Sequence, residues 1–187
     1  MGLFSFEHSR TTYLVDFAVH GAAVLALLSA LAVLNPEAPG LELPALVALG
    51  WLAWSLAEYL LHRFVLHGLK PFSTLHGLHH QQPQALLATP TVVSAGLILV
   101  LVLLPLLALA EAWRAVAVTL GVAGGYLLYS LAHHATHHGR SRGAWLLRRR
   151  HWHALHHRAG RKPGYFGIST LVWDRLFGTL PRLNAAP

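Results

Sequence analysis

The sequence contains no cysteine, and this absence excludes several kinds of chemistry. Disulfide bonds, thiolate metal sites, iron–sulfur clusters and a cysteine nucleophile all need the thiol group. Any metal site must therefore use nitrogen or oxygen ligands. Charged residues are also scarce, at 11% of the 187 residues, whereas 55% are hydrophobic. This composition is typical of a membrane protein and unusual for a soluble domain.

Four apolar runs, each 18 to 20 residues long, support a membrane protein. A helix of that length rises about 1.5 Å per residue and spans a hydrocarbon core of about 30 Å. The first run has no clear basic segment before it and no small-residue cleavage site after it, so we expect a retained helix and not a signal peptide. The four expected spans are Phe17–Leu34, Leu43–Leu61, Thr91–Ala110 and Ala115–Ala132.

The links between these runs predict how the spans are connected. Asn35–Gly40 and Glu111–Arg114 are short enough only for tight helical hairpins. Four spans leave both termini on one side of the membrane. Of the 14 lysine and arginine residues, 13 fall on that side and only Arg114 falls opposite. By the positive-inside rule, the basic side is cytoplasmic.

This orientation, together with attraction to anionic lipid headgroups, explains the net charge of +7. The basic residues form no recognised nucleic-acid-binding motif, so we expect no nucleic-acid partner. The predicted fold is all-α, an integral membrane protein with four transmembrane helices arranged as two hairpins. We expect one membrane-embedded domain over residues 1–187, with a cytoplasmic helical cap formed by residues 62–90 and 133–187.

Histidine is in large excess, with 15 residues in the chain. All except His8 and His20 lie at or beyond the cytoplasmic end of an expected span. The pattern His-x-x-His-His occurs twice, first in a short predicted helix from about Phe72 and again near residue 155. So many histidines gathered on one membrane face predict a metal site with imidazole ligands.

The spacing of the histidines indicates how they can act together. Residues i, i+3 and i+4 share one face of a helix, so each His-x-x-His-His group can point three imidazoles at one place. His62 and His67 are five apart and would diverge on a straight helix, so we expect His67 past the helix end or on another edge of the site. One metal ion cannot use ten ligands, but two can. The ten candidates are His62, His67, His76, His79, His80, His133, His137, His153, His156 and His157.

The other histidines have simpler interpretations. We expect His8, His20 and His151 to lie at the membrane interface and to reach toward the headgroups without binding metal. On a helix, His134 points about 100° away from its neighbour, which favours a structural role, whereas His138 can support His137.

Four segments, in order, resemble a known family: "EYLLHRFVLH" from Glu58, "HGLHHQQP" from His76, "YSLAHHATHH" from Tyr129, and "HALHH" followed by "YFGISTLVWDRLFGT" up to Thr179. This pattern resembles the fatty acid hydroxylase and sterol desaturase superfamily of integral-membrane di-metal oxygenases, and within it the fatty acid 2-hydroxylase branch. The resemblance covers residues 43 to 180 and implies the same ten histidine ligands. Two departures affect residues beyond the ligands, because Tyr129-Ser130 stands where longer members have Tyr-Asp and "QALLATPT" replaces charged residues after the second segment.

The resemblance implies two metal ions that activate O₂. We expect iron, although the isolated protein can contain zinc in its place. Neutral imidazoles bind Fe(II) well. A ligating imidazole usually donates its second N–H to a carboxylate, carbonyl or water. The residues expected beside the ligands are Glu58, Tyr129, His138 and Asp174.

The sequence therefore predicts a di-iron, O₂-dependent membrane hydroxylase that acts on a fatty acyl chain near its head. A desaturase or a sterol or carotenoid oxygenase could use the same site, and a non-enzymatic metal-binding membrane protein is the alternative of another class. Sixteen residues precede the first span, too few for a haem-binding domain, so we expect a separate electron-donor protein. We expect a multi-pass protein of a bacterial inner membrane, and the residues predict no oligomeric state.

Overall fold

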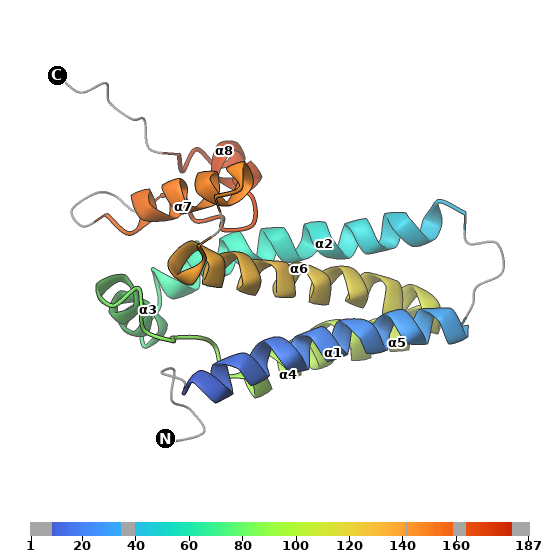
Figure 1. The fold of residues 1–187 in the computed structure, drawn as a ribbon. Helices are drawn as coiled ribbons and strands as arrows, with labels where there is room; N and C mark the ends of the chain where they lie inside the picture. The colour runs from blue at the N-terminus through green and yellow to red at the C-terminus, as the bar shows by residue number, and fades with distance from the viewer. Residues whose placement is uncertain (1–8, 35–39, 141, 159–163, 181–187) are drawn as a thin grey trace. The chain divides into compact units, whose positions relative to one another are not determined.

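The computed structural model describes residues 9–34, 40–140, 142–158 and 164–180. Within these residues the protein is helical and has no β-strand, which confirms the all-α prediction (Figure 1). The long helices are α1 (Arg10–Leu34), α2 (Glu42–Leu60) and α6 (Ala112–His138). The shorter ones are α3 (Phe72–Gln81), α4 (Thr91–Ile98), α5 (Leu104–Leu109), α7 (Ala144–His156) and α8 (Val172–Leu176), and two π-helical segments are η1 (Leu61–Leu66) and η2 (Leu99–Leu103).

Four stretches of helix are long and apolar enough to cross a membrane, as predicted. They are Arg10–Leu34, Glu42–Leu66, Thr91–Leu109 and Ala112–His138. The third is α4, η2 and α5 in sequence. Its π-helical part directly precedes Pro105, whose missing N–H breaks the regular hydrogen-bond ladder of an α-helix.

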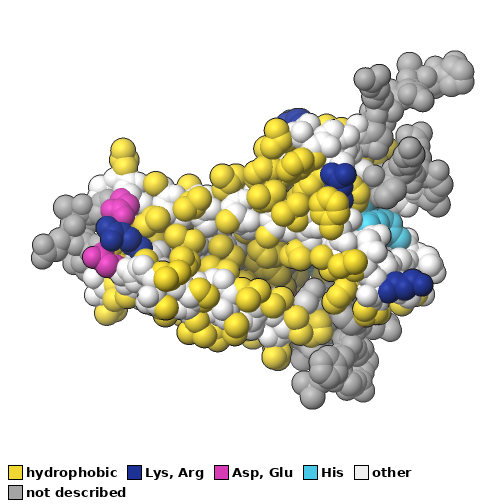
Figure 2. All heavy atoms as spheres, turned by 180° about the vertical axis from the view of Figure 1, so that it is seen from behind, with side chains coloured by type: hydrophobic (Ala, Val, Ile, Leu, Met, Phe, Trp, Pro, Cys, Tyr) yellow, Lys and Arg dark blue, Asp and Glu magenta, His cyan; other side chains and the backbone are white. Residues whose placement is uncertain are grey.

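The chain divides into two compact units. The first is formed by residues 1–54 and 85–130, and the second by residues 55–84 and 131–187. In the first unit, α6 contributes most of the buried residues, and small side chains such as Ala115, Ala117 and Ala123 let its neighbours approach. The spanning helices expose many large hydrophobic side chains, and hydrophobic side chains predominate on the face shown in Figure 2. Such surfaces suit contact with lipid chains.

Glycines on α6 set the distance between helices in the first unit. A Cβ on Gly121 would lie 2.1 Å from the carbonyl oxygen of Val47 and 2.9 Å from the Cα of Gly50. Close packing of two helix backbones therefore requires glycine here. Gly124, by contrast, faces open space. It lines an apolar pocket of about 690 Å³ formed by α1, α2 and α6, with Leu28, Leu31, Pro44, Trp51 and Leu120 among the other lining residues.

A buried polar cluster joins α1 to α4. The Thr91 hydroxyl donates a hydrogen bond of 2.8 Å to Asp16, and the Ser94 hydroxyl lies 3.2 Å from Nε2 of His20. Nδ1 of His20 lies 2.8 Å from the Asp16 carbonyl oxygen. His20 is only 3% exposed, so the expectation that it reaches toward the headgroups is wrong. An ionisable side chain inside a span must find polar partners, and these neighbours supply them.

The second unit contains the end of α2, η1, α3, the end of α6, α7, α8 and the residues 164–171 before α8. Its hydrophobic core is small and consists of Leu155, Tyr165 and Leu171, with Trp152 and Leu180 packed against it. The predicted short helix from Phe72 is present as α3, and the helix of the fourth span continues beyond the predicted end at Ala132 to His138. All ten predicted ligands belong to this unit.

Candidate metal centre

The structure sorts nine of the ten predicted histidine ligands into two sets. Within each set, one ring nitrogen from every residue lies within 4.8 Å of those of the other members. We call them set A, formed by His62, His67, His76, His80 and His156, and set B, formed by His79, His133, His137 and His153. No acidic residue belongs to either set.

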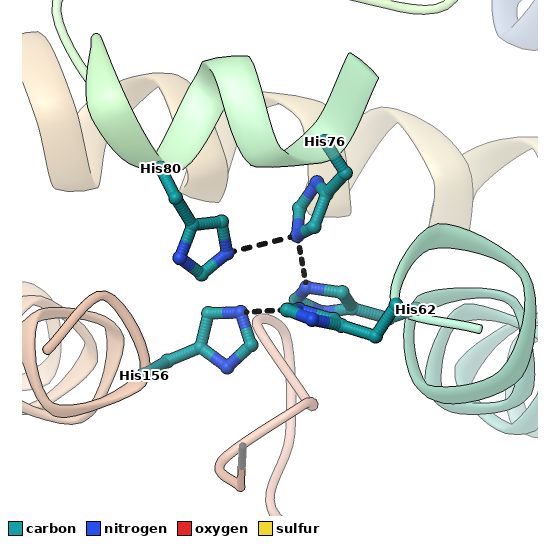
Figure 3. A group of neighbouring side chains, drawn as sticks. His62, His76, His80 and His156 are labelled. Atoms are coloured by element: carbon teal, nitrogen blue, oxygen red, sulfur yellow. Dashed lines mark hydrogen bonds between the residues drawn. The ribbon is translucent and has the colours of Figure 1, made fainter. Parts of the chain in front are cut away.

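Set A collects side chains from three elements of the second unit. The rings of His62, His76, His80 and His156 point toward one another (Figure 3). Nε2 of His76 lies 3.0 Å from Nε2 of His62 and 3.0 Å from Nε2 of His80. The i, i+4 spacing of His76 and His80 on α3 places both on one face, as the sequence predicts.

The fifth member of set A depends on the π-helical segment η1. His62 and His67 are five residues apart, and the His67 amide donates to the His62 carbonyl oxygen at 3.1 Å. This i to i+5 hydrogen bond widens the turn and brings the two rings to 5.2 Å between centroids. His67 follows the end of η1, as expected, and its Nε2 lies 3.1 Å from Nε2 of His156.

Set B is a chain of short contacts between Nε2 atoms. The distances are 3.1 Å from His79 to His133, 3.2 Å from His133 to His137, and 2.7 Å from His137 to His153. His133 and His137, four residues apart on α6, are therefore directed at one point, together with one residue from α3 and one from α7. Adjacent histidines of α3 serve different sets, because His79 belongs to set B and His80 to set A.

His157 belongs to neither set but adjoins both. Its ring stacks on His80 with centroids 4.2 Å apart, and it lies 4.4 Å from the ring of His153 and 4.8 Å from that of His79. Both of its ring nitrogens are buried and have no hydrogen-bond partner among the described residues. Buried polar atoms normally have partners, so the His157 side chain is suited to bind a metal ion.

The distances within each set fit metal coordination. Two nitrogens bound to one metal at about 2.0–2.1 Å in tetrahedral geometry are about 3.3 Å apart, and they are somewhat closer in higher coordination. The shortest separations between Nε2 atoms are 2.7 to 3.2 Å, and all the ligand atoms of a set lie within 4.8 Å of one another. Each set can therefore hold one metal ion, which gives a candidate di-metal centre.

The rings are also held in the protonation state that metal binding needs. Burial, reinforced by neighbouring imidazoles, lowers the pKa of His67 to about 4 and that of His79 to about 3. Burial likewise lowers the pKa of His156 to about 3 and that of His157 to about 2. A neutral imidazole offers a lone pair, so at pH 7 these residues are ready to bind metal.

Backbone carbonyls fix the tautomer of two set A residues. Nδ1 of His62 lies 2.5 Å from the Phe166 carbonyl oxygen, and Nδ1 of His156 lies 2.7 Å from that of Gly164. A carbonyl only accepts, so each Nδ1 carries the proton and donates it. A neutral ring then has its lone pair on Nε2, the atom that faces the other members of the set.

Glu58 and Asp174 were expected beside the ligands, and both are buried in the second unit. Neither carboxylate contacts an imidazole. Glu58 accepts hydrogen bonds from the amides of Ile168 and Ser169 at 2.6 and 2.9 Å, and from the Ser169 hydroxyl at 2.5 Å. Both carboxylates are thus one step removed from the ligands, because they hold the segment whose carbonyls contact His62 and His156.

The remaining candidates take different places. Tyr129 lies in the first unit, where its ring contacts those of Trp54 and Tyr126. His138 stacks on His134 at 4.9 Å and lies 6.3 Å from the ring of His137. His151 is exposed, and residue 8 lies outside the described residues.

The carbonyls of Gly164 and Phe166 are functional groups that the sequence did not reveal. A backbone carbonyl has no residue-type signature, and the partners of these two are 104 and 8 residues away in sequence. The available signal was the pair of glycines at 164 and 167, the second of them inside the segment "YFGIST".

Comparisons with known proteins agree with this geometry. The family model described as "Fatty acid hydroxylase" matches residues 47–179. The dihydroceramide fatty acyl 2-hydroxylase FAH2 of Arabidopsis thaliana is 36% identical over 155 residues, covering 78% of this chain and 64% of the relative. The human fatty acid 2-hydroxylase is 39% identical over 150 residues, covering 73% of this chain and 40% of the relative.

A solved structure is also similar. It is that of full-length scs7p, in which only the hydroxylase domain is visible, with a TM-score of 0.75 and 26% identity over 93% of this chain and 67% of that chain. The chain spans two fifths to two thirds of the length of the plant and human relatives. These relatives are eukaryotic and give no support to the bacterial inner membrane expected from the sequence.

Proposed function

The chain belongs to the fatty acid hydroxylase family, and we propose that it is an O₂-dependent di-iron lipid hydroxylase of a membrane. The observation that carries this proposal is the pair of histidine sets in the second unit, each with ring nitrogens directed at one point. A protein that only stored or bound a metal ion would not need two adjacent sites built entirely from neutral imidazoles. Both sets adjoin a common ring, that of His157.

We assign one metal ion to each set. We also assign all ten predicted histidines as metal ligands. His157 is proposed as the fifth ligand of the set B position, because its ring lies within 5.0 Å of the rings of His79, His137 and His153. Its two buried nitrogens without partners support this assignment. Iron is the proposed metal, since imidazoles suit Fe(II) and the reaction requires a redox-active ion, while zinc can occupy the same ligands.

When bound, the two iron ions would supply the redox chemistry that amino-acid side chains lack, reducing O₂ and oxidising an unactivated C–H bond. The overall reaction uses O₂, two electrons and two protons, places one oxygen atom in a C–H bond and releases the other as water. The electrons are proposed to come from a separate donor protein. The chain itself keeps its imidazoles neutral by burial and fixes their tautomers through the carbonyls of Gly164 and Phe166.

The proposed substrate is a membrane lipid with a fatty acyl chain, oxidised near its head. The names of the plant and human relatives, which are fatty acyl or fatty acid 2-hydroxylases, support this class. The apolar surfaces of the spanning helices would admit such a lipid from the bilayer. Exposed basic residues of the second unit, including Arg142, Arg148 and Arg158, suit phosphate-bearing headgroups.

We also propose that the whole chain acts as one membrane-embedded domain with both termini and the metal centre on the cytoplasmic side. The family model runs through both compact units, which supports a single domain. The distribution of lysine and arginine supports the orientation.

Mass spectrometry of lipids tests the proposal. A host that expresses the full chain, grown with aeration and added iron, should contain an acyl chain heavier by one oxygen atom. The matched control is His137→Ala, which removes one set B ligand. Fragmentation that places the oxygen next to the carboxyl carbon would establish 2-hydroxylation. A product lighter by two hydrogens would instead make the enzyme a desaturase, and unchanged lipids with a verified electron donor would contradict an oxygenase.

A further inference from the structure

The segment Gly164–Ser169, which we call the clamp loop, is held by two buried carboxylates. Four consecutive backbone amides point at them. Phe166 and Gly167 donate to Asp174 at 2.8 Å each, and Ile168 and Ser169 donate to Glu58. Carboxylates that accept several backbone N–H groups make charge-assisted hydrogen bonds, which are stronger than neutral ones. The path of the loop is therefore fixed from both sides, by α2 and by α8.

The backbone of the clamp loop is shaped for this task. Tyr165 adopts a left-handed conformation with φ of 56°, which is uncommon for a residue with a side chain, and it lies between the two carbonyls that contact histidines. Gly167 has no room for a side chain. A Cβ there would lie 1.8 Å from the Thr170 carbonyl oxygen and 3.0 Å from Oδ2 of Asp174. Any other residue at this position must displace the loop.

The two carbonyls of the clamp loop that contact histidines both serve set A. Phe166 accepts from His62 and Gly164 accepts from His156. Set B contains two ligands whose outer ring nitrogens lack such a contact among the residues that the structure describes. Nδ1 of His79 and Nδ1 of His153 are both buried there without a hydrogen-bond partner. The carbonyl contacts of the clamp loop therefore orient ligands of set A.

We propose that the clamp loop is the positioning element of the set A metal position alone, and that Glu58 and Asp174 act as positioning residues through it. This inference rests on the proposed di-metal function. Removing the hydrogen-bond partner of a metal-binding histidine typically weakens metal binding about 10- to 100-fold. A displaced clamp loop removes two such partners from set A and none from set B.

Zinc binding to the purified full chain tests this asymmetry without requiring enzyme activity. Zn²⁺ is titrated against a competing chelator, and bound zinc is counted by elemental mass spectrometry. The wild-type chain should hold two ions, one for each set. Gly167→Ala should weaken one of the two positions by at least about tenfold and leave the other unchanged. Unchanged helicity and elution volume would show that the variant is folded.

Double variants identify which position has changed. Combining Gly167→Ala with the set A variant His62→Ala should cause no further loss of zinc, because both changes affect the same position. Combining Gly167→Ala with the set B variant His79→Ala should remove nearly all bound zinc. If Gly167→Ala weakens both positions equally, or neither, the inference is overturned.

The pair Glu58→Gln and Glu58→Leu tests whether Glu58 acts through geometry. Glutamine keeps an acceptor for the amides of Ile168 and Ser169, so this variant should retain both zinc ions. Leucine has no acceptor and should reproduce the loss at the set A position. Equal loss in both variants would contradict a role through the clamp loop. A chain that holds two zinc ions but oxidises no lipid when loaded with iron would contradict the proposed function and leave this inference standing.

Discussion

The ring of His157 stacks on the ring of His80, with centroids 4.2 Å and planes 11° apart. His80 belongs to set A, while the other close neighbours of His157 are set B rings. The His157 side chain thus lies at the junction of the two candidate metal positions. An imidazole ring in this place can serve as the last ligand of one metal position and can lie between the two metal positions.

This arrangement leads to a prediction for His157→Ala. If His157 is the fifth ligand at set B, its removal should weaken zinc binding at one position and leave the five set A ligands intact. The measurement is again a zinc titration with a competing chelator. His151→Ala is the matched control, because His151 is exposed on the same helix, and it should bind as much zinc as the wild type. Full affinity at both positions of His157→Ala would remove His157 from the ligand list.

Two glycines of α6 give a matched pair for packing in the first unit. Gly121→Ala places a methyl group 2.1 Å from the carbonyl oxygen of Val47, so α2 and α6 must move apart. Overpacking of this kind typically costs about 1–3 kcal/mol. Gly124→Ala adds the same group in open space and should be tolerated. Thermal unfolding in detergent should therefore separate the two variants, and equal midpoints would argue against backbone contact at Gly121.

The polar link between α1 and α4 predicts a modest loss of stability for Thr91→Val. Valine keeps the shape of the side chain but cannot donate the 2.8 Å hydrogen bond to Asp16. Hydrogen bonds between membrane helices contribute about 0.6 kcal/mol on average and up to about 1.7 kcal/mol. Unfolding in detergent should report a loss in this range. Zinc binding should be unchanged, because all the ligands belong to the other unit.

The lowered pKa values predict how the stability of the metal-free protein depends on pH. Burial lowers the pKa of His79 and of His156 to about 3, from 6.5 in a model compound. Above pH 6.5 both the folded and the unfolded chains are neutral at these positions. As the pH falls below 6.5, these histidines become protonated in the unfolded chain but stay neutral in the folded chain. The free energy of unfolding therefore decreases down to about pH 3.

The loss is at most about 1.4 kcal/mol per pH unit for each of these two residues. After removal of metal with a chelator, the unfolding midpoint should therefore fall between pH 7 and pH 5. The double variant His79→Gln and His156→Gln removes two of the titrating groups and should show a shallower fall. A slope that is the same as in the wild type would mean that other groups control this pH dependence.

The sequence was sufficient for the spans because their signal is local. A run of apolar residues identifies a helix that crosses the bilayer whatever its neighbours are, and all four predicted spans are present. The i, i+3 and i+4 spacing of His76, His79 and His80 predicted three imidazoles directed at one place. The structure instead divides them, with His76 and His80 in set A and His79 in set B. His20 was misjudged because its partners, Ser94 and Tyr126, are more than 70 residues away in sequence.

The sequence alone thus determined that this is a helical membrane protein, and it predicted ten histidine ligands, nine of which the structure gathers into two sets. The tertiary structure decided how they divide. Neighbouring residues of one helix, His79 and His80, face different sets, and the π-helical turn brings His67 back toward His62. It also revealed the clamp loop, whose contacts with Glu58 and His62 cross more than 100 residues. Backbone carbonyls and amides are common to every residue, so only their arrangement in space shows which of them orient a ligand.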